Sequence, residues 1–164
     1  MNFYQPKTLP NLMVAPNGAR RTKSDHPAIP VTLEETVETA KRCHAAGAEA
    51  IHFHLRDDAQ QHILDAGLYK EGLVELYRQV PEMHLQITTE AVGRYSPEEM
   101  TKIAYDVMPP GISIGVAEMM PSRQPSADNL RLYQSLYEAG CRVQHLCYQP
   151  EEVDLLARLI SEAG

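Results

Sequence analysis

Short apolar runs alternate along the chain with longer segments of helical periodicity. The apolar runs predict strands at Leu12 to Pro16, Ala50 to Leu55, Leu85 to Thr89, Ile112 to Ala117 and Val143 to Tyr148. After each run, apolar side chains recur at spacings of three and four residues, as on the buried face of an amphipathic helix. The pattern therefore predicts five βα units with a parallel sheet.

Capping residues mark where these helices begin and end. Thr32 and Glu35 have the spacing of a capping box, in which each residue satisfies a free backbone N–H group at the start of a helix. The predicted starts are Thr32, Ser96, Ser126 and Pro150, and the predicted glycine stops are Gly47, Gly140 and Gly164. These signals place the strands and helices in strict alternation.

The spacing of the predicted strands indicates a barrel. The strands start about 30 to 40 residues apart, so eight such units would approach the ~250 residues of a TIM (β/α)₈ barrel. We therefore expect an α/β, TIM-barrel-like fold with only about five βα units present, and residues 1–164 as a single domain, the N-terminal portion of a catalytic domain. An open doubly wound sheet also fits the count. Its nucleotide-binding form should carry G-x-G-x-x-G after the first strand, where this chain has Asn17-Gly18-Ala19-Arg20.

Composition narrows the classes of function. Lys and Arg number 15 against 22 Asp and Glu, a formal charge of −7, which argues against a nucleic-acid-binding surface. The 3 cysteines lack the spacing of a disulfide framework, which favours a reducing compartment. The sequence shows no signal-peptide pattern, and no apolar run approaches the roughly 20 residues that span a bilayer. We expect a cytoplasmic protein with no nucleic-acid or membrane partner.

Two histidines in the second predicted strand are the most informative residues. His52 and His54 alternate with apolar residues, so on a strand both imidazoles lie on one face while the apolar side chains pack on the helices. Barrel active sites lie at the C-terminal ends of strands. Paired neutral imidazoles suit Zn²⁺ or a similar ion, completed by a carboxylate or a third histidine. The pair predicts a metal site, and the alternative is two hydrogen-bonded core histidines.

Polar residues after the first two strands are further candidates. The long loop after the first strand carries Arg20, Arg21 and Lys23, which would attract a carboxylate or a phosphate unless they form a plain solvated surface. Asp57 follows the histidine pair and is placed to orient a ligand histidine, with a plain loop as the alternative.

The later strands also carry polar residues. Thr88 ends the third predicted strand and Ser113 lies in the fourth. In the fifth, either Gln144 or His145 faces inward, and the pattern leaves open which. The chain has no G-x-S-x-G, Walker A or C-x-x-C motif, which weakens serine hydrolase, P-loop and zinc-finger interpretations.

Four stretches in this order resemble the β-keto acid cleavage enzymes, a family that includes 3-keto-5-aminohexanoate cleavage enzyme. The stretches are Met13 to Arg20, Asp25 to Thr32, Ala46 to Ala48 leading into His52 to Asp57, and His62 to Asp65. The resemblance implies a zinc-dependent TIM-barrel enzyme, usually a homo-oligomer. Such an enzyme condenses a β-keto acid with acetyl-CoA as co-substrate and splits the adduct into acetoacetate and a new acyl-CoA.

Site residues follow from the resemblance position by position. It implies that His52 and His54 are zinc ligands and that Asn17, Thr88 and Ser113 bind substrate. Zinc would polarise the keto group as a Lewis acid. The third zinc ligand of the family, a glutamate, and its catalytic Arg and Asp belong to a later segment that the chain does not contain. We therefore expect the 164-residue chain not to be a complete catalyst.

Some positions depart from the family, and other functions stay open. Asn17 stands where some members carry an acidic substrate contact, and Gln144 where many have Glu. One alternative is an amidohydrolase-type metal hydrolase, although that class usually places H-x-H on its first strand. Another is a non-catalytic half-barrel whose edge strands favour self-association, with Glu90, Glu118 or His145 as a substitute third ligand.

Overall fold

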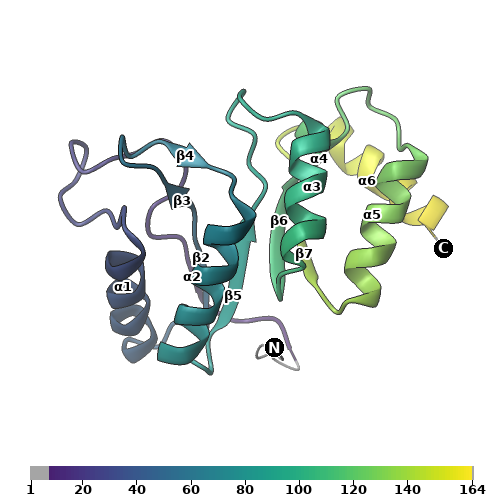
Figure 1. The fold of residues 1–164 in the computed structure, drawn as a ribbon. Coiled ribbons are helices and arrows are strands. Elements are labelled where there is room, and N and C mark those ends of the chain that lie inside the picture. Colours follow the sequence, from purple (N-terminus) through teal and green to yellow (C-terminus); the bar gives the residue numbers. More distant parts are fainter. Residues whose placement is uncertain (1–7, 164) are drawn as a thin grey trace. The chain divides into compact units, whose positions relative to one another are not determined.

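The structure, a computed structural model, describes residues 8–163 in two compact units, one ending at Thr88 and the other beginning at Thr89 (Figure 1). Parallel strands are paired within each unit and connected by helices. The prediction of one domain over residues 1–164 stays a prediction, and its first seven residues and Gly164 lie outside the described part.

The first unit contains three parallel strands, two helices and a small ribbon. Its elements are β1 (Met13–Val14), α1 (Leu33–Ala45), β2 (Ala50–His52), β3 (Leu55–Arg56), β4 (His62–Ile63), α2 (Ala66–Gln79) and β5 (His84–Thr88). Strand β2 pairs in parallel with β1 on one side and with β5 on the other. The ribbon is formed by β3 and β4, which pair antiparallel. The sheet therefore places the end of β2 between two neighbouring strands.

Apolar side chains of β2 and α2 form the core of this unit. Phe53 is buried and meets the ring of Tyr69 edge to face, with the centroids 5.8 Å apart. Gly72 permits this packing, because a Cβ at that position would lie 3.3 Å from the Phe53 ring. The helices α1 and α2 lie side by side (Figure 1). Phe53 thus packs on α2 as the alternation predicts, whereas Leu55 lies in the ribbon.

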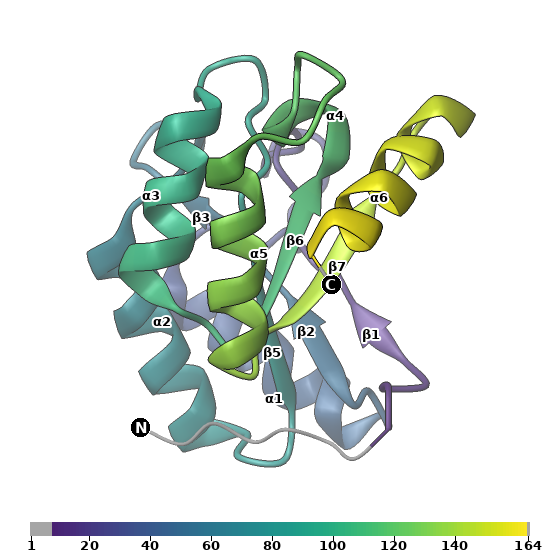
Figure 2. The same cartoon turned by 90° about the vertical axis from the view of Figure 1, so that its right-hand side faces the viewer.

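The second unit has two parallel strands and four helices. Its elements are α3 (Pro97–Val107), β6 (Gly111–Gly115), α4 (Val116–Met119), α5 (Ala127–Glu138), β7 (Arg142–Leu146) and α6 (Pro150–Ala163). Helices α3 and α5 lie beside one another over the β6–β7 pair (Figure 2). Buried apolar residues from both layers, among them Met100, Ile112 and Leu132, form the core.

The helix caps predicted at Thr32, Ser96, Ser126, Gly47 and Gly140 are confirmed, whereas the stop predicted at Gly164 lies outside the described residues. Thr32, Ser96 and Ser126 each accept a hydrogen bond from the backbone three residues on, and a reciprocal bond completes a capping box at each helix. Gly47 and Gly140 have positive φ angles of 100° and 73°, which a glycine adopts without steric cost. Local sequence therefore decides where these helices begin and end.

All five predicted strands run past the observed C-terminal ends, and at two of these ends the chain enters another element. Strand β2 stops at His52, because the chain leaves the sheet and Leu55 pairs with Ile63 in the ribbon. Strand β6 stops at Gly115, because the next residue begins α4, whose turn is closed by the bond from Met120 N to Val116 O. The prediction also missed the ribbon. Among residues 8–163, no helix is both long enough and apolar enough to cross a bilayer.

Candidate functional site

His52 and His54 bring their imidazoles together at the C-terminal end of β2. Their Nε2 atoms lie 2.9 Å apart, and the rings meet at 70° with centroids 4.9 Å apart. The backbone has left the strand after His52, yet the two side chains still converge while Phe53 points into the core. The structure therefore presents two imidazole nitrogens to one point.

Gln86 binds the other nitrogen of the His52 ring. It lies on β5 directly opposite His52 in the parallel register, and its Oε1 is 2.7 Å from His52 Nδ1. The carboxamide oxygen only accepts hydrogen bonds, so Nδ1 donates and Nε2 keeps its lone pair. Sequence reasoning missed Gln86, although its alternation with Thr88 on β5 places both on one face.

Asn17 holds the backbone of His54. Its Nδ2 donates to the carbonyl of His54 at 2.9 Å, and its Oδ1 accepts from the His54 N–H at 3.1 Å. Asn17 is buried. The amide therefore supplies backbone partners at the point where β2 has ended and the sheet no longer does. The substrate contact predicted for Asn17 stays a prediction.

Both imidazoles are held in the neutral form that a metal ligand requires. Burial lowers the pKa of His52, against a smaller opposing effect of the bond to Gln86. Burial, together with charge on His52, His62, Arg56 and Arg20, lowers the pKa of His54 to about 2. Neutral imidazoles with a lone pair on Nε2 are the form that binds Zn²⁺.

A third histidine lies beside the pair. His62, on β4, is buried, and its ring meets that of His54 at 65° with the centroids 4.9 Å apart. Sequence reasoning placed His62 only within a family stretch. The signal for its position is the short turn between Arg56 and His62, which pair across the ribbon.

Arg56 fastens the first loop to the ribbon. Its guanidinium donates to the carbonyls of Asn17, Gly18, Ala19 and Arg21, and also to Gln60 O at 2.8 Å. A planar group with five donors suits such a ring of acceptors. The loop that contains Asn17 is therefore anchored by a residue two positions after His54.

The structure gives Asp57 and the basic loop other partners than those suggested by the sequence. Asp57 accepts the Gln61 N–H at 2.8 Å and closes the ribbon turn, so Gln86 rather than Asp57 contacts the histidine pair. Arg21 forms an ion pair with Asp25, and Lys23 with Glu35. Arg21 thus pairs within the loop itself, and Lys23 ties the loop to α1.

Thr88 ends β5 on the same face as Gln86 and is almost fully buried. Ser113 lies in β6 of the second unit and is equally buried. The neighbouring Thr89 donates its hydroxyl to the carbonyl of Ser113 at 3.1 Å, which identifies Thr89 as a structural residue. The substrate-binding roles of Thr88 and Ser113 stay predictions.

Within the second unit, the structure shows which of Gln144 and His145 in β7 shares the face of Ser113. Gln144 is the register partner of Ser113 and is exposed, so it shares the face of that serine. His145 instead stacks on Tyr133 of α5, with the ring centroids 5.3 Å apart. His145 therefore packs on a helix and is not placed as a ligand on the Ser113 face.

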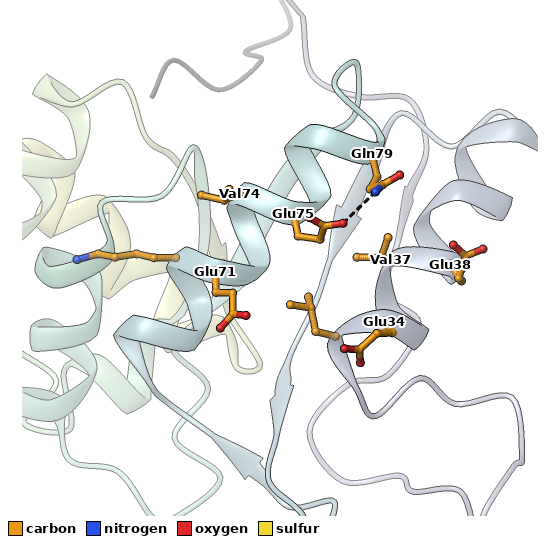
Figure 3. A pocket seen from close by; sticks show the side chains of 9 residues that line it. Glu34, Val37, Glu38, Glu71, Val74, Glu75 and Gln79 are labelled. Carbon is orange, nitrogen blue, oxygen red and sulfur yellow. Dashed lines mark hydrogen bonds between the residues drawn. The ribbon is translucent and has the colours of Figure 1, made fainter.

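Two of the hollows in the first unit border both α1 and α2. One, of about 470 Å³, borders His54 and Arg56 and reaches the first turns of α1 and α2. The other, of about 570 Å³, runs between α1 and α2, where Figure 3 shows glutamates of both helices around Val37 and Val74. Of the described residues, no histidine, cysteine, serine or threonine lines this hollow between α1 and α2, so these residues do not place the predicted chemistry there.

The histidine pair is an incomplete metal site within the described residues. Among residues 8–163, no three side chains of His, Cys, Asp or Glu are arranged to hold a metal ion. Two Nε2 atoms at 2.9 Å, one of them fixed as a lone-pair donor by Gln86, nevertheless fit a shared Zn²⁺ ion that takes further ligands. The residues present therefore fit part of a zinc site.

Fold and site together describe an α/β protein with polar groups at the ends of parallel strands. Residues 11–164 match the family of beta-keto acid cleavage enzymes. Because the match covers nearly the whole chain, the protein belongs to this family. The family assignment weighs against the amidohydrolase alternative.

Curated relatives match part of the chain. The 3-keto-5-aminohexanoate cleavage enzyme of Fusobacterium nucleatum is 32% identical over 84 residues, which cover 51% of this chain and 31% of that enzyme. The 3-oxoadipate:acetyl-CoA acetyltransferase of Cupriavidus necator is 30% identical over 78 residues, or 48% of this chain and 28% of that protein. Each alignment thus spans less than a third of the relative.

A solved structure supports the fold. The binary complex of ObcA with oxaloacetate matches with a TM-score of 0.67 and 18% identity, over 84% of this chain and 34% of that chain. At this identity the likeness concerns the fold alone. The predicted fold class, α/β with the βα units of a partial TIM barrel, is confirmed.

Proposed function

We propose that this chain forms part of a zinc-dependent enzyme that condenses a β-keto acid with acetyl-CoA and releases acetoacetate and a new acyl-CoA. Membership of the β-keto acid cleavage family supports the reaction type. The observation that carries the zinc requirement is the convergence of His52 Nε2 and His54 Nε2 at 2.9 Å. The pairing of Gln86 with the far side of the His52 ring strengthens it.

In this proposal His52 and His54 hold the metal through their Nε2 atoms. Bound zinc would supply Lewis-acid polarisation of the substrate keto group. The resemblance to the family implies that a glutamate from a later segment completes the ligands. Burial keeps both imidazoles neutral, so protons do not compete with the metal at neutral pH.

The remaining polar residues bind the substrate or orient the site. Thr88 offers a hydroxyl at the end of β5 for a substrate carboxylate, and Ser113 offers another at β6. We assign Asn17 first to holding the His54 backbone, because both polar atoms of its amide are bonded there. Its remaining hydrogen-bonding capacity is available for substrate, since an amide nitrogen has two hydrogens and its oxygen two lone pairs.

The setting of the enzyme belongs to the same proposal. We propose a cytoplasmic homo-oligomer that takes a small β-keto acid and acetyl-CoA, in keeping with the acetyl-CoA acetyltransferase among its relatives. Its acidic balance, −7 overall, agrees with the absence of a nucleic-acid partner. The alternative of a non-catalytic half-barrel differs in one respect that is easily measured, the formation of acetoacetate.

The experiment is an acetoacetate assay on the chain completed by the later segment that supplies the glutamate ligand and the catalytic Arg and Asp, with a panel of β-keto acids, with and without acetyl-CoA. The proposal predicts product only with both substrates, and loss of product in His52→Ala. The matched control is His44→Gln, because His44 lies near the end of α1 and bonds Ala48 O. Product without acetyl-CoA, or no product from any β-keto acid, would contradict the proposed reaction.

A further inference from the structure

Gln86 has no assigned part in the proposed chemistry, yet its side-chain oxygen lies 2.7 Å from Nδ1 of His52. We infer that Gln86 is a positioning residue that fixes the Nδ1–H tautomer of His52, so that the Nε2 lone pair points to the metal position. The tautomer of His52 follows from the geometry alone, whereas its consequence for zinc binding rests on the proposed function.

The sheet places Gln86 for this role. Parallel pairing of β2 with β5 sets the Cα atoms of His52 and Gln86 opposite one another, so their side chains leave the sheet on the same face. The Gln86 carbonyl also accepts the N–H of Phe53 at 3.1 Å. One residue thus bonds the backbone just after His52 and the ring of His52 itself.

Burial makes the contact rigid and selective. Gln86 is only 3% exposed, so its side chain has little freedom and water does not compete for Oε1. The 2.7 Å separation of Oε1 and Nδ1 is that of a strong hydrogen bond. Because the oxygen cannot donate, the Nδ1–H tautomer of His52 makes this bond and the Nε2–H tautomer does not.

The same bond determines which histidine donates in the hydrogen bond between His52 and His54. With Nδ1 protonated, His52 Nε2 has no hydrogen, so the 2.9 Å contact requires His54 Nε2 to donate in the metal-free protein. A glutamine keeps the site neutral, whereas a glutamate here would add negative charge beside the substrate position. Gln86 therefore sets the direction of the His52 lone pair without changing the charge of the site.

The first test reads the tautomer directly. Nitrogen-15 NMR of the histidine rings is recorded on the metal-free protein, with His52 assigned by its loss in His52→Gln. We expect a protonated Nδ1 and an unprotonated Nε2 at His52, a mixed or reversed tautomer in Gln86→Leu, and the wild-type tautomer in Gln86→Glu. The control is Gln79→Leu, a glutamine of α2 that bonds Glu75.

An Nε2–H tautomer in the wild type, or an unchanged tautomer in Gln86→Leu, would overturn the inference. The wild-type spectrum alone is decisive should Gln86→Leu fail to fold, which thermal unfolding of each variant checks. The tautomer is read without metal, so this result is independent of whether the proposed reaction occurs.

The second test measures zinc affinity by competition with a chelator. Loss of a partner that orients a ligand histidine weakens metal binding by about 10- to 100-fold, so we expect that loss in Gln86→Leu and recovery in Gln86→Glu. Wild-type affinity in Gln86→Leu would overturn the role toward the metal. Absence of zinc binding in the wild type, with the expected tautomer, would refute the zinc proposal and leave the tautomer assignment standing.

Discussion

The side-chain amide of Asn17 pairs with the backbone of His54 through two hydrogen bonds, of 2.9 and 3.1 Å, as a neighbouring strand would. The pairing comes where β2 has ended and the second imidazole still has to be aimed. An asparagine after the first strand thus determines the position of a histidine 37 residues further along the chain.

Asn17→Ala should therefore destabilise the protein. The change leaves the buried N–H and carbonyl of His54 without these partners, which costs about 1–3 kcal/mol in the free energy of unfolding. Urea denaturation measures the loss. The matched control is Asn11→Ala, because Asn11 bonds Glu49 at the exposed surface. Equal losses of stability in the two variants would show that the two bonds from Asn17 to the His54 backbone contribute no more than a bond at the exposed surface.

Arg56→Lys should release the first loop. Lysine presents a single ammonium group and cannot reach carbonyls on both sides as the guanidinium does. We expect faster proteolytic cleavage between residues 17 and 31 and a loss of at least about 1 kcal/mol in stability. Arg78→Lys, which alters an exposed pair with Glu75, should leave the stability almost unchanged. A protected loop in Arg56→Lys would contradict the anchoring role.

The two adjacent threonines should respond differently to replacement by valine. Thr88→Val removes the hydroxyl proposed for the substrate carboxylate, so KM for the β-keto acid should rise about tenfold, the loss of about 1.4 kcal/mol of binding. Thr89→Val instead removes the bond to Ser113 O and should cost about 1 kcal/mol of stability. Steady-state kinetics beside thermal unfolding distinguishes them. The assignment fails if KM is unchanged in Thr88→Val.

Alkaline pH should lower the stability of the second unit, because the buried thiol of Cys141 loses its proton there. Burial raises the pKa of this thiol to about 12 from its ordinary value near 9. Between these pH values the folded protein binds more protons than the unfolded chain. The free energy of unfolding therefore falls as the pH rises from 9 toward 12. Urea denaturation at pH 8 to 11 should show this slope, and Cys141→Ala should flatten it. An unchanged slope in the variant would assign the effect to other groups.

Regular elements were predictable because their causes are local. The capping boxes at Thr32 and Ser96 and the glycine stops act over a few residues, and a short apolar run marked each strand. The convergence of His52 and His54 followed from their alternation with apolar residues. The ends of β2 and β6 were not predicted, because the residues that follow them form a ribbon and a short helix instead of continuing the strands.

The partners of the site residues depend on contacts between distant segments. Gln86 meets His52 only through the register of β2 with β5, and one residue of slip would turn it away. His62 reaches His54 only through the ribbon. The sequence assigned the orienting role to Asp57, the nearest carboxylate along the chain, whereas the structure uses Asp57 in a turn.

The central claim is that His52 and His54 together hold zinc. The most direct measurement is the zinc content per chain by elemental analysis of the purified protein that includes the later segment with the glutamate ligand, beside His52→Ala/His54→Ala and the control His44→Gln. The account predicts near-stoichiometric zinc in the wild type and in His44→Gln, and its loss in the double variant. Zinc retained by the double variant, or absent from the wild type after saturation with Zn²⁺ and dialysis, would contradict it.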